Sequence, residues 1–441
     1  MKFSGRWRYL SAVLFLALAV RLVALPGVHR VQYTSDEREY LHMSRQLLGE
    51  GIFEDSNGDR AVRAPLFPIV LSGLLFLGDG SLVVPHVFGC LLGTVVVALV
   101  YALAMQIWAD HRGALSASLI AALYPGLIVY SALLQTETLY IALFLAAFIF
   151  FYRLERSLHV RWAVLCGIAC GLAALTRAVF AGFIVVLILV LLYQERARLV
   201  PALKAGAVLL VASILVIVPW TIRNTALLGS VVPVASGGGS SLLTGNNPYA
   251  IGTYRVREGY DEWFRGKALE KGVADVSRLN ESERSALSAR IARDYMTAHP
   301  VETVLLAVKK SYIFWVYPIL HTDSYVPLQL LAVGCDAILL TLFAVGVIGM
   351  GFLKGRLLPV WAAVLFFWLV QALLHSESRF RLPLIPLLAI FAGWALVLLW
   401  RRSRRTRLLR SRARRGMIAW ALAGIVSLYA LTGVLFMRGI I

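Results

Sequence analysis

Long apolar stretches recur along the whole chain, and most approach the 20 or so residues that a helix needs to cross a bilayer. Two longer segments interrupt them, at 26–80 and 220–325. We expect about eleven membrane-spanning helices, at residues 9–25, 81–107, 113–133, 137–153, 160–176, 178–194, 204–219, 326–351, 357–375, 382–400 and 417–437. No small-residue cleavage site follows the first stretch, which indicates a retained helix and not a signal peptide.

Composition supports a membrane protein. Hydrophobic residues make up 59% of the 441 positions, and a mean hydropathy of +0.76 is rare in soluble domains. We therefore expect an all-α polytopic fold in three parts. These are a transmembrane module over 1–225 that includes the 26–80 loop, an outer loop region with an interfacial helix over 226–325, and further transmembrane helices over 326–441.

The net charge of +19 is carried by clusters between the apolar stretches. They lie at Met1–Arg8, Asp110–Arg112, Arg153–Arg161, Glu195–Lys204, Lys354–Arg356 and Arg401–Arg415. With a cytoplasmic N-terminus, all of them fall on one side of the membrane. This is the positive-inside pattern, so the charge predicts membrane orientation and not nucleic-acid binding. The two long loops then face outward.

Two segments are ambiguous. Residues 64–80 are short and begin with two prolines, and residues 300–320 carry Lys309 and Lys310 near the middle. If only one of these segments crossed, the sidedness of most later loops would invert. We place both as interfacial helices on the outer face and leave open whether they span.

An acidic stretch, "YTSDEREYLHMSRQLLGEG", follows the first apolar segment at 33–51. Thr34 and Glu37 fit a capping box, which predicts a short outer helix over 35–49. Its apolar positions would lie on the membrane surface: Tyr40, Leu41, Met43, Leu47 and Leu48. Capping explains Glu37, but it does not single out Asp36.

The cysteines and a glycine-rich stretch say little about function. The four cysteines all lie in apolar segments, so no disulfide framework or metal pair is indicated. The three glycines at 237–239 lack a following Lys–Ser/Thr pair and predict a flexible loop.

Four motifs together resemble a family. They are "DEREYLHMSRQL" (36–47), "RAPLFP" (63–68), "QTETLY" (135–140) and "HSESRFRLP" (375–383). In order and spacing they are similar to the bacterial GT-C glycosyltransferases, the relatives of the protein O-mannosyltransferases and the lipid A aminoarabinose transferase. The resemblance implies inverting transfer of a monosaccharide from a polyprenyl-phosphate-linked donor to an acceptor hydroxyl. It also implies a multi-pass protein of the bacterial inner membrane with an extracytoplasmic active site.

The transfer needs a base for the acceptor hydroxyl. Asp36 matches the family's catalytic position, and an interfacial setting can raise the pKa of a carboxyl toward the working range. Glu137 matches the acid at the start of the fourth helix and would orient the acceptor or the sugar.

The leaving phosphate gains charge and needs cations, for which the forked guanidinium is suited. Arg63 matches the family's basic residue before the prolines. Arg379 and Arg381 lie in the late motif, and Arg177 and Arg223 lie at outer helix ends. All five are expected outside, where the positive-inside bias does not explain them.

Further substrate contacts are expected from Tyr40, His42, Glu377, Asn246 and Asn247, although Glu377 has the alternative of pairing with Arg379 or Arg381. No metal site is expected, since the most similar relatives work without one, but a divalent cation is left open because some GT-C enzymes use it.

Two other functions stay open. One is a glycan ligase or polymerase with a diphosphate-linked lipid donor, and the other is a lipid or sugar flippase. Transporters place charges near mid-bilayer, whereas here the middles of the spans are almost free of charge. That favours chemistry at one face. The sugar, the acceptor (lipid, glycan or protein) and the oligomeric state are not determined by the sequence.

Overall fold

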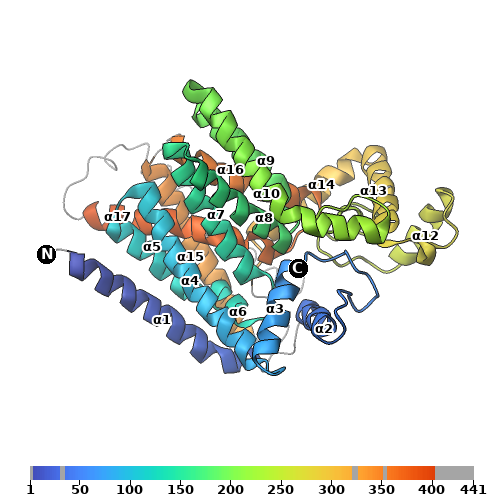
Figure 1. The fold of residues 1–441 in the computed structure, drawn as a ribbon, viewed down its shortest axis with the longest axis horizontal. Helices are drawn as coiled ribbons and strands as arrows, with labels where there is room; N and C mark the ends of the chain where they lie inside the picture. The colour runs from blue at the N-terminus through green and yellow to red at the C-terminus, as the bar shows by residue number, and fades with distance from the viewer. Residues whose placement is uncertain (1–2, 30–34, 320–325, 351–354, 403–441) are drawn as a thin grey trace.

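The computed structural model describes residues 3–29, 35–319, 326–350 and 355–402 (Figure 1). Within these ranges the regular secondary structure is helical, apart from one isolated bridge between Ala250 and Val256. The all-α prediction is confirmed. Ten of the predicted spans coincide with helical segments, and the last, 417–437, lies outside the described residues.

The helices of the bundle run in chain order. They are α1 (Phe3–His29), α4 (Val83–Trp108), α5 (His111–Leu123), α6 (Pro125–Ala132), α7 (Glu137–Ser157), α8 (Val160–Thr176), α9 (Phe180–Gln194), α10 (Leu199–Leu228), α15 (Val326–Met350), α16 (Leu358–Leu373) and α17 (Ile385–Arg402). Of the described helices, seven are long and apolar enough to cross a membrane, or eight if α5 and α6 form one span. Because α8 and α9 are shorter, the total of eleven stays a prediction.

The predicted span 113–133 is broken. Helices α5 and α6 meet at an angle of 55°. Tyr124 between them is extended, as expected for a residue that precedes a proline, and Pro125 begins the new helix. Arg21 of α1 donates a hydrogen bond to the Ala122 carbonyl at 3.3 Å, which satisfies one of the acceptors left over at the end of α5.

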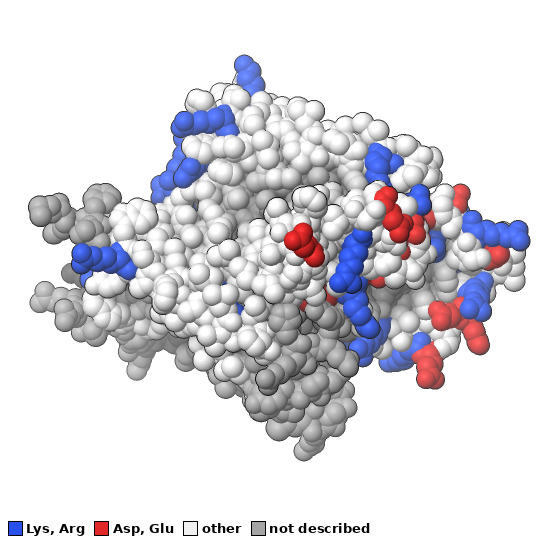
Figure 2. Space-filling view, turned by 60° about the horizontal axis from the view of Figure 1, so that its bottom comes forward, with Lys and Arg blue, Asp and Glu red and all other residues white. Residues whose placement is uncertain are grey.

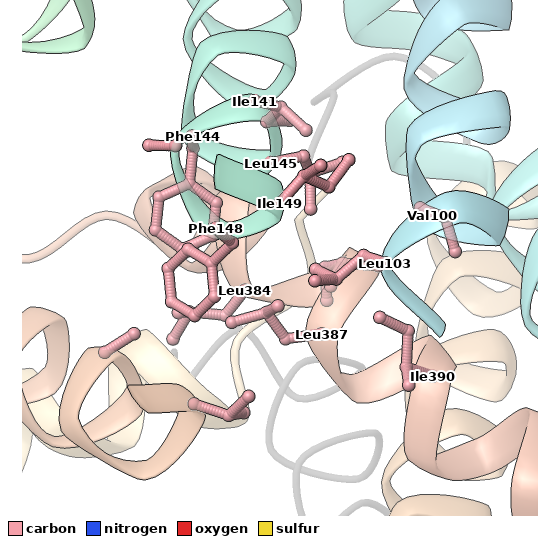
Figure 3. Close-up of a cluster of buried hydrophobic side chains, with 14 of the residues drawn as sticks. Val100, Leu103, Ile141, Phe144, Leu145, Phe148, Ile149, Leu384, Leu387 and Ile390 are labelled. Carbon is pink, nitrogen blue, oxygen red and sulfur yellow. The ribbon is translucent and has the colours of Figure 1, made fainter. Parts of the chain in front are cut away.

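The core is centred on α7 and α17 (Figure 3). Phe144 and Phe148 of α7 pack in one cluster with Val100 and Leu103 of α4 and with Leu384 at the start of α17. In the apolar stretch of α7, 72% of the residues are buried inside the protein, against 17% in that of α1. The central helices are therefore enclosed by protein, and the peripheral ones present apolar faces outward, as a membrane protein requires.

Charge divides the bundle into two ends. On the face drawn in Figure 2, basic side chains stand alone at one end, mixed charges gather at the other, and the surface between them is largely uncharged. We call the first the basic end; its arginines include Arg112, Arg153, Arg156, Arg161, Arg196, Arg198 and Arg356. We call the second the loop end; it carries α2 (Ser35–Glu50), α3 (Leu66–Leu77), α11 (Gly238–Gly245), α12 (Tyr260–Glu270), α13 (Glu281–Ala298) and α14 (Pro300–Trp315).

The two ambiguous segments form the short helices α3 and α14. With 12 residues, α3 is about 18 Å long, well short of the roughly 30 Å hydrocarbon core. Helix α14 has 16 residues, including Lys309 and Lys310. Neither belongs to the described helices that can span alone. Their interfacial placement stays a prediction.

The predicted helix over 35–49 is α2, but its environment differs from the expectation. Tyr40 and Met43 are buried within the protein, because α3 packs against this face of α2. Glu37 is also buried and accepts a hydrogen bond from the Leu134 N–H at 3.0 Å. Its role in a capping box with Thr34 lies outside the described residues.

Helices α11 and α13, with α12 beside them, form a small lobe with its own apolar core of Leu243, Ala268, Leu287, Ile291 and Ala292. The glycines predicted to form a flexible loop instead open α11. A Cβ on Gly239 would lie 1.9 Å from the Ser285 carbonyl oxygen, so only glycine permits this approach of α11 to α13. The division of the chain at 225 and 325 stays a prediction.

Candidate active site

Asp36 lies between two arginines at the loop end. Its Oδ1 accepts a hydrogen bond from Arg63 Nη2 at 3.0 Å, and its Oδ2 pairs with Arg379 Nη2 at 2.6 Å. The side chains of Asp36, Arg379 and Arg63 are 16%, 24% and 36% exposed. The structure thus brings together three residues that the sequence motifs place far apart along the chain.

Three different elements supply this triad. Asp36 lies in the first turn of α2, where a carboxylate is favoured by the helix dipole. Arg63 lies in the irregular segment just before α3. Arg379 lies on the 3-10 helix η4 (Ser378–Leu384), which joins α16 to α17.

The two arginines dominate the electrostatics of Asp36. Burial favours the neutral acid, but Arg379 and Arg63 outweigh it and hold the pKa of Asp36 below its usual range. The expectation that its setting raises this pKa is therefore wrong for the arrangement described. Asp36 is a carboxylate at neutral pH.

A second ion pair lies beside the triad. Glu137, at the start of α7, is 1% exposed and pairs with Arg177 at 2.5 Å. Arg177 Nε also donates to the Thr136 hydroxyl at 3.1 Å. The guanidinium carbons of Arg177 and Arg379 both lie 5.6 Å from the centre of the Phe380 ring, so one aromatic side chain links the two ion pairs.

Tyrosines line the same cluster. The ring of Tyr40 lies 5.6 Å from the Arg63 guanidinium, and its contact with substrate stays a prediction. Tyr130, on α6, lies within electrostatic range of Arg379 and Arg177. We did not expect Tyr130 here, because only the break at Pro125 shows that this part of the predicted span forms a separate short helix.

His375 is a second residue without an expected role. Its ring centre lies 5.8 Å from that of Phe380, and burial lowers its pKa. Its Nδ1 is buried and has no hydrogen-bond partner among the described residues. The histidine belongs to the late motif, so its position in the sequence offered the signal.

Arg381 lies apart from the triad, contrary to the expectation. It is 2% exposed and forms a buried ion pair with Asp336 of α15. It also donates to the backbone carbonyls of Phe314 at 2.8 Å and Tyr317 at 2.7 Å. These contacts join η4 to α14 and α15, so they assign Arg381 to helix packing and not to a donor phosphate.

Arg223 is likewise occupied elsewhere. Its guanidinium donates to the carbonyl of Arg60 at 2.7 Å and to that of Phe53 at 3.2 Å, and it lies over the Trp220 ring. Arg223 therefore holds the segment before Arg63 in place, and the expectation of a direct phosphate contact is not supported.

Asn246 and Asn247 are buried and satisfied by the backbone. Asn246 Nδ2 donates to the Leu373 carbonyl at 2.7 Å, and Asn247 Nδ2 donates to that of Leu243 at 2.8 Å. Both side chains stabilise the end of α11, which corrects the prediction that they contact a sugar.

Of the last two predicted contacts, only His42 lies apart from the cluster, whereas Glu377 lies within electrostatic range of Tyr130, as Arg379 and Arg177 do. His42 lies on the other face of α2, in a surface depression of about 470 Å³ that Arg38 and Arg45 also line. Glu377 accepts a hydrogen bond from the Tyr254 N–H at 3.2 Å and so ties the late motif to the loop after α11.

The positive charge of the cluster comes from Arg63, Arg177 and Arg379. Among the residues that the structure describes, no three His, Cys, Asp or Glu side chains gather in a way that could hold a metal ion. Metal dependence stays a prediction.

Comparisons with known proteins show which family this chain is similar to. Residues 62–222 match the family model described as dolichyl-phosphate-mannose-protein mannosyltransferase. The chain is 29% identical over 230 residues to the undecaprenyl phosphate-alpha-4-amino-4-deoxy-L-arabinose arabinosyl transferase of Serratia proteamaculans, a match that covers 49% of this chain and 40% of that protein. It is 30% identical over 206 residues to the same transferase of Pseudomonas aeruginosa, covering 42% and 35%. The chain thus matches less than half the length of these relatives.

A solved structure extends the likeness of the fold. The oligosaccharyltransferase of Archaeoglobus fulgidus, in complex with an inhibitory peptide and a dolichol-phosphate, superposes with a TM-score of 0.58 at 15% identity, over 98% of this chain and 56% of that one. The resemblance drawn from the four motifs is confirmed: this chain is similar to the GT-C glycosyltransferases in sequence over residues 62–222 and in fold over nearly its described length.

Proposed function

We propose that this chain is a membrane glycosyltransferase that moves a monosaccharide from a polyprenyl-phosphate-linked donor to an acceptor hydroxyl, with inversion at the anomeric carbon. The observation that carries the proposal is the single carboxylate of Asp36 held between Arg63 and Arg379. The relatives named for an undecaprenyl-phosphate-linked sugar support a donor of this class.

The charge of the cluster suits a phosphate. The described ion pairs with Asp36 and Glu137 use only some of the N–H groups of Arg63, Arg177 and Arg379. The guanidinium N–H groups beyond these pairs stay available for phosphate oxygens. When the sugar departs, the phosphate gains charge, so these contacts strengthen toward the products and favour transfer.

Donor binding would also activate the base. While both arginines hold Asp36, its lowered pKa makes it a weak proton acceptor. A phosphate that draws the guanidiniums to itself removes part of this effect, so the pKa of Asp36 rises once the donor is bound. Asp36 then takes the proton of the acceptor hydroxyl, whose oxygen attacks the anomeric carbon as the bond to the phosphate oxygen breaks on the opposite face.

The Glu137–Arg177 pair would complete the site. Arg177 and Arg379 both lie 5.6 Å from the centre of the Phe380 ring, so we expect Arg177 to reach the same donor as Arg379. Glu137 fixes the direction of Arg177 and, through it, the orientation of the sugar. By the positive-inside rule the basic end faces the cytoplasm, which puts Asp36 at the extracytoplasmic face of a bacterial inner membrane.

The test uses the purified full-length chain in lipid nanodiscs with synthetic undecaprenyl-phosphate sugars and an envelope lipid and glycan extract. Mass spectrometry measures the undecaprenyl phosphate released and the acceptor that gains mass. The parent should release it and Asp36→Asn should not. Equal release by both would refute the assignment of the base. Release of a polyprenyl diphosphate would support the ligase, and movement of intact donor between leaflets would support the flippase.

A further inference from the structure

Lys310 of α14 is a buried cation without an acidic partner. It is 0% exposed. Its Nζ donates to the carbonyls of Gly245 and Leu373, both at 3.2 Å, and to Asn246 Oδ1 at 3.0 Å. Among the described residues no Asp or Glu forms an ion pair with it. Burying a charged lysine is costly, so its hydrogen bonds must offset that cost and point to a role for the charge.

The carbonyls that Lys310 binds end two helices. Gly245 is the last residue of α11, and Leu373 is the last residue of α16. Helix C-termini present unpaired carbonyls and the negative end of the helix dipole, which suit a cation. Asn246 strengthens the junction, because its Nδ2 also donates to the Leu373 carbonyl at 2.7 Å. Lys310 thus joins α11, α14 and α16 at one point.

The junction is tightly packed. A Cβ on Gly245 would lie 2.3 Å from the carbonyl oxygen of Leu374, so α11 approaches the end of α16 as closely as a glycine permits. This close approach is a separate observation from the hydrogen bonds of Lys310, and it also shows that the end of α11 packs against the end of α16.

The segment from Leu373 to Arg379 starts at this junction. Its next anchors are hydrogen bonds from the Ser376 N–H to the Gly252 carbonyl at 2.9 Å and from the Ser378 hydroxyl to the Pro318 carbonyl at 2.7 Å. Both partners follow α11 or α14. The position of Arg379 therefore depends on how α11 and α14 are held against the end of α16.

We propose that Lys310, as a cation, is a positioning residue that joins the ends of α11 and α16 and thereby sets the place of Arg379 relative to Asp36. The role of Arg379 in donor binding rests on the proposed function. The position of the segment Leu373–Arg379 does not.

Protonation of Lys310 gives this role a pH dependence. Burial lowers the pKa of Lys310 from 10.5 to about 8. The neutral amine keeps two N–H donors for three acceptors, so one contact of the junction is lost. The groups that face Lys310 are Asn246 of α11 and His375 beyond α16, with Lys309 next to it on α14, and none of these is an acid.

A rise in pH is expected to have opposite effects on the stability of the fold and on activity. Because the folded-state pKa is lowered, the unfolded chain binds the proton more tightly, and the contribution of Lys310 to the free energy of unfolding rises between pH 8 and 10.5. Deprotonation therefore loosens the junction without weakening the fold. If Lys310 only stabilised the fold, its deprotonation between pH 8 and 10.5 would not lower activity.

The experiment compares the parent, Lys310→Arg, Lys310→Met and the matched control Lys309→Met, which alters an exposed lysine on the same helix. We expect the kcat/KM of the parent for the undecaprenyl-phosphate sugar to fall as the pH rises through about 8. Lys310→Arg should retain its activity to higher pH, because arginine stays charged. Below about pH 8, where Lys310 of the parent is charged, Lys310→Met should lose roughly a hundredfold, the effect of misplacing a reacting group by about 1 Å.

A second measurement needs no substrate. Hydrogen exchange followed by mass spectrometry should show faster exchange of Leu373–Arg379 in Lys310→Met than in Lys309→Met at the same pH. Equal exchange in these two variants would overturn the inference. It would also be overturned if the kcat/KM of Lys310→Arg fell at the same alkaline pH as that of the parent. If the parent transfers no sugar, the proposed function has failed, and the exchange comparison still decides whether Lys310 fixes the segment. The same comparison decides the question if Lys310→Arg does not fold.

Discussion

Asp36 and Arg379 pair at 2.6 Å, although one lies on the first helix of the loop end and the other just before the last helix that the structure describes. Arg63 completes the contact from a third element. This ion-pair network joins α2, the segment before α3 and η4, which are far apart along the chain.

Asp36→Asn should lower kcat by at least about 10²-fold, because the amide cannot take the proton of the acceptor. Donor binding should stay unchanged or become tighter, since the substitution removes the anion that competes with the donor phosphate for Arg63 and Arg379. Turnover and equilibrium binding of the undecaprenyl-phosphate sugar measure the two effects separately. Glu39→Gln is the control, because Glu39 lies on the same helix and contacts only Ser56 in a described hydrogen bond. Weaker donor binding in Asp36→Asn would contradict the prediction.

Arg379→Gln and Arg63→Gln should both weaken donor binding. A hydrogen bond to a charged group contributes about 1.5–3 kcal/mol, so the donor KM should rise tenfold or more. Arg379→Gln should have the larger effect, since Arg379 is the more buried of the two. Arg38→Gln is the matched control, because Arg38 lies on α2 and lines the depression on its far face. Equal donor KM values in Arg379→Gln and Arg38→Gln would exclude a phosphate contact.

The triad was predicted from the resemblance to a family, because Asp36 and Arg63 match its motifs and Arg379 lies in the late motif. The apolar pattern added only that all three lie on one side of the membrane. Arg381 shows where this reasoning stops. It lies two residues after Arg379 on a 3-10 helix, whose three residues per turn direct the two side chains to different faces. Its partner Asp336 lies inside the predicted span 326–351. Hydropathy averages over such a residue and cannot show that it is paired.

The burial of α2 against protein could not be predicted from the sequence either. Apolar positions on a short helix indicate that one face is buried, but not whether lipid or protein covers it. The structure covers Tyr40 and Met43 with α3. Tyr130 reached the site because the chain breaks at Pro125, and the proline inside the predicted span 113–133 was the available signal.

Arg381→Met should destabilise the fold without acting through the donor. Asp336 would be left as a buried charge without its cation, which typically costs about 3–5 kcal/mol. Thermal unfolding in detergent should show the loss, and adding Asp336→Asn to Arg381→Met should recover part of it because the stranded charge is removed. In the fraction that stays folded, the donor KM should rise less than in Arg379→Gln, because Arg381 acts only by holding η4 in place. A raised donor KM at parental stability would instead put Arg381 in the site.

Removal of divalent metal ions should leave transfer unchanged. In the proposed site the guanidiniums of Arg63 and Arg379 supply the positive charge that the leaving phosphate needs. The measurement is the turnover rate after treatment with EDTA and exchange into metal-free buffer. Activity that is lost with EDTA and restored by Mg²⁺ or Mn²⁺ would show that the chain works with a divalent cation.

The acid limbs of kcat/KM and kcat should lie at different pH values. In the free enzyme Arg379 and Arg63 hold the pKa of Asp36 below 3.8, so the stabilisation from this network is present above pH 3.8 and is lost only as the pH falls through the lower, folded-state value. The profile of kcat/KM reports this free enzyme, whereas that of kcat reports the donor complex. Because the donor phosphate draws the arginines away from Asp36, the limb of kcat should lie at higher pH. Coincident limbs, measured at saturating and at low donor concentration, would mean that donor binding does not release the base, and Asp36 would then serve only as the counter-ion of the two arginines.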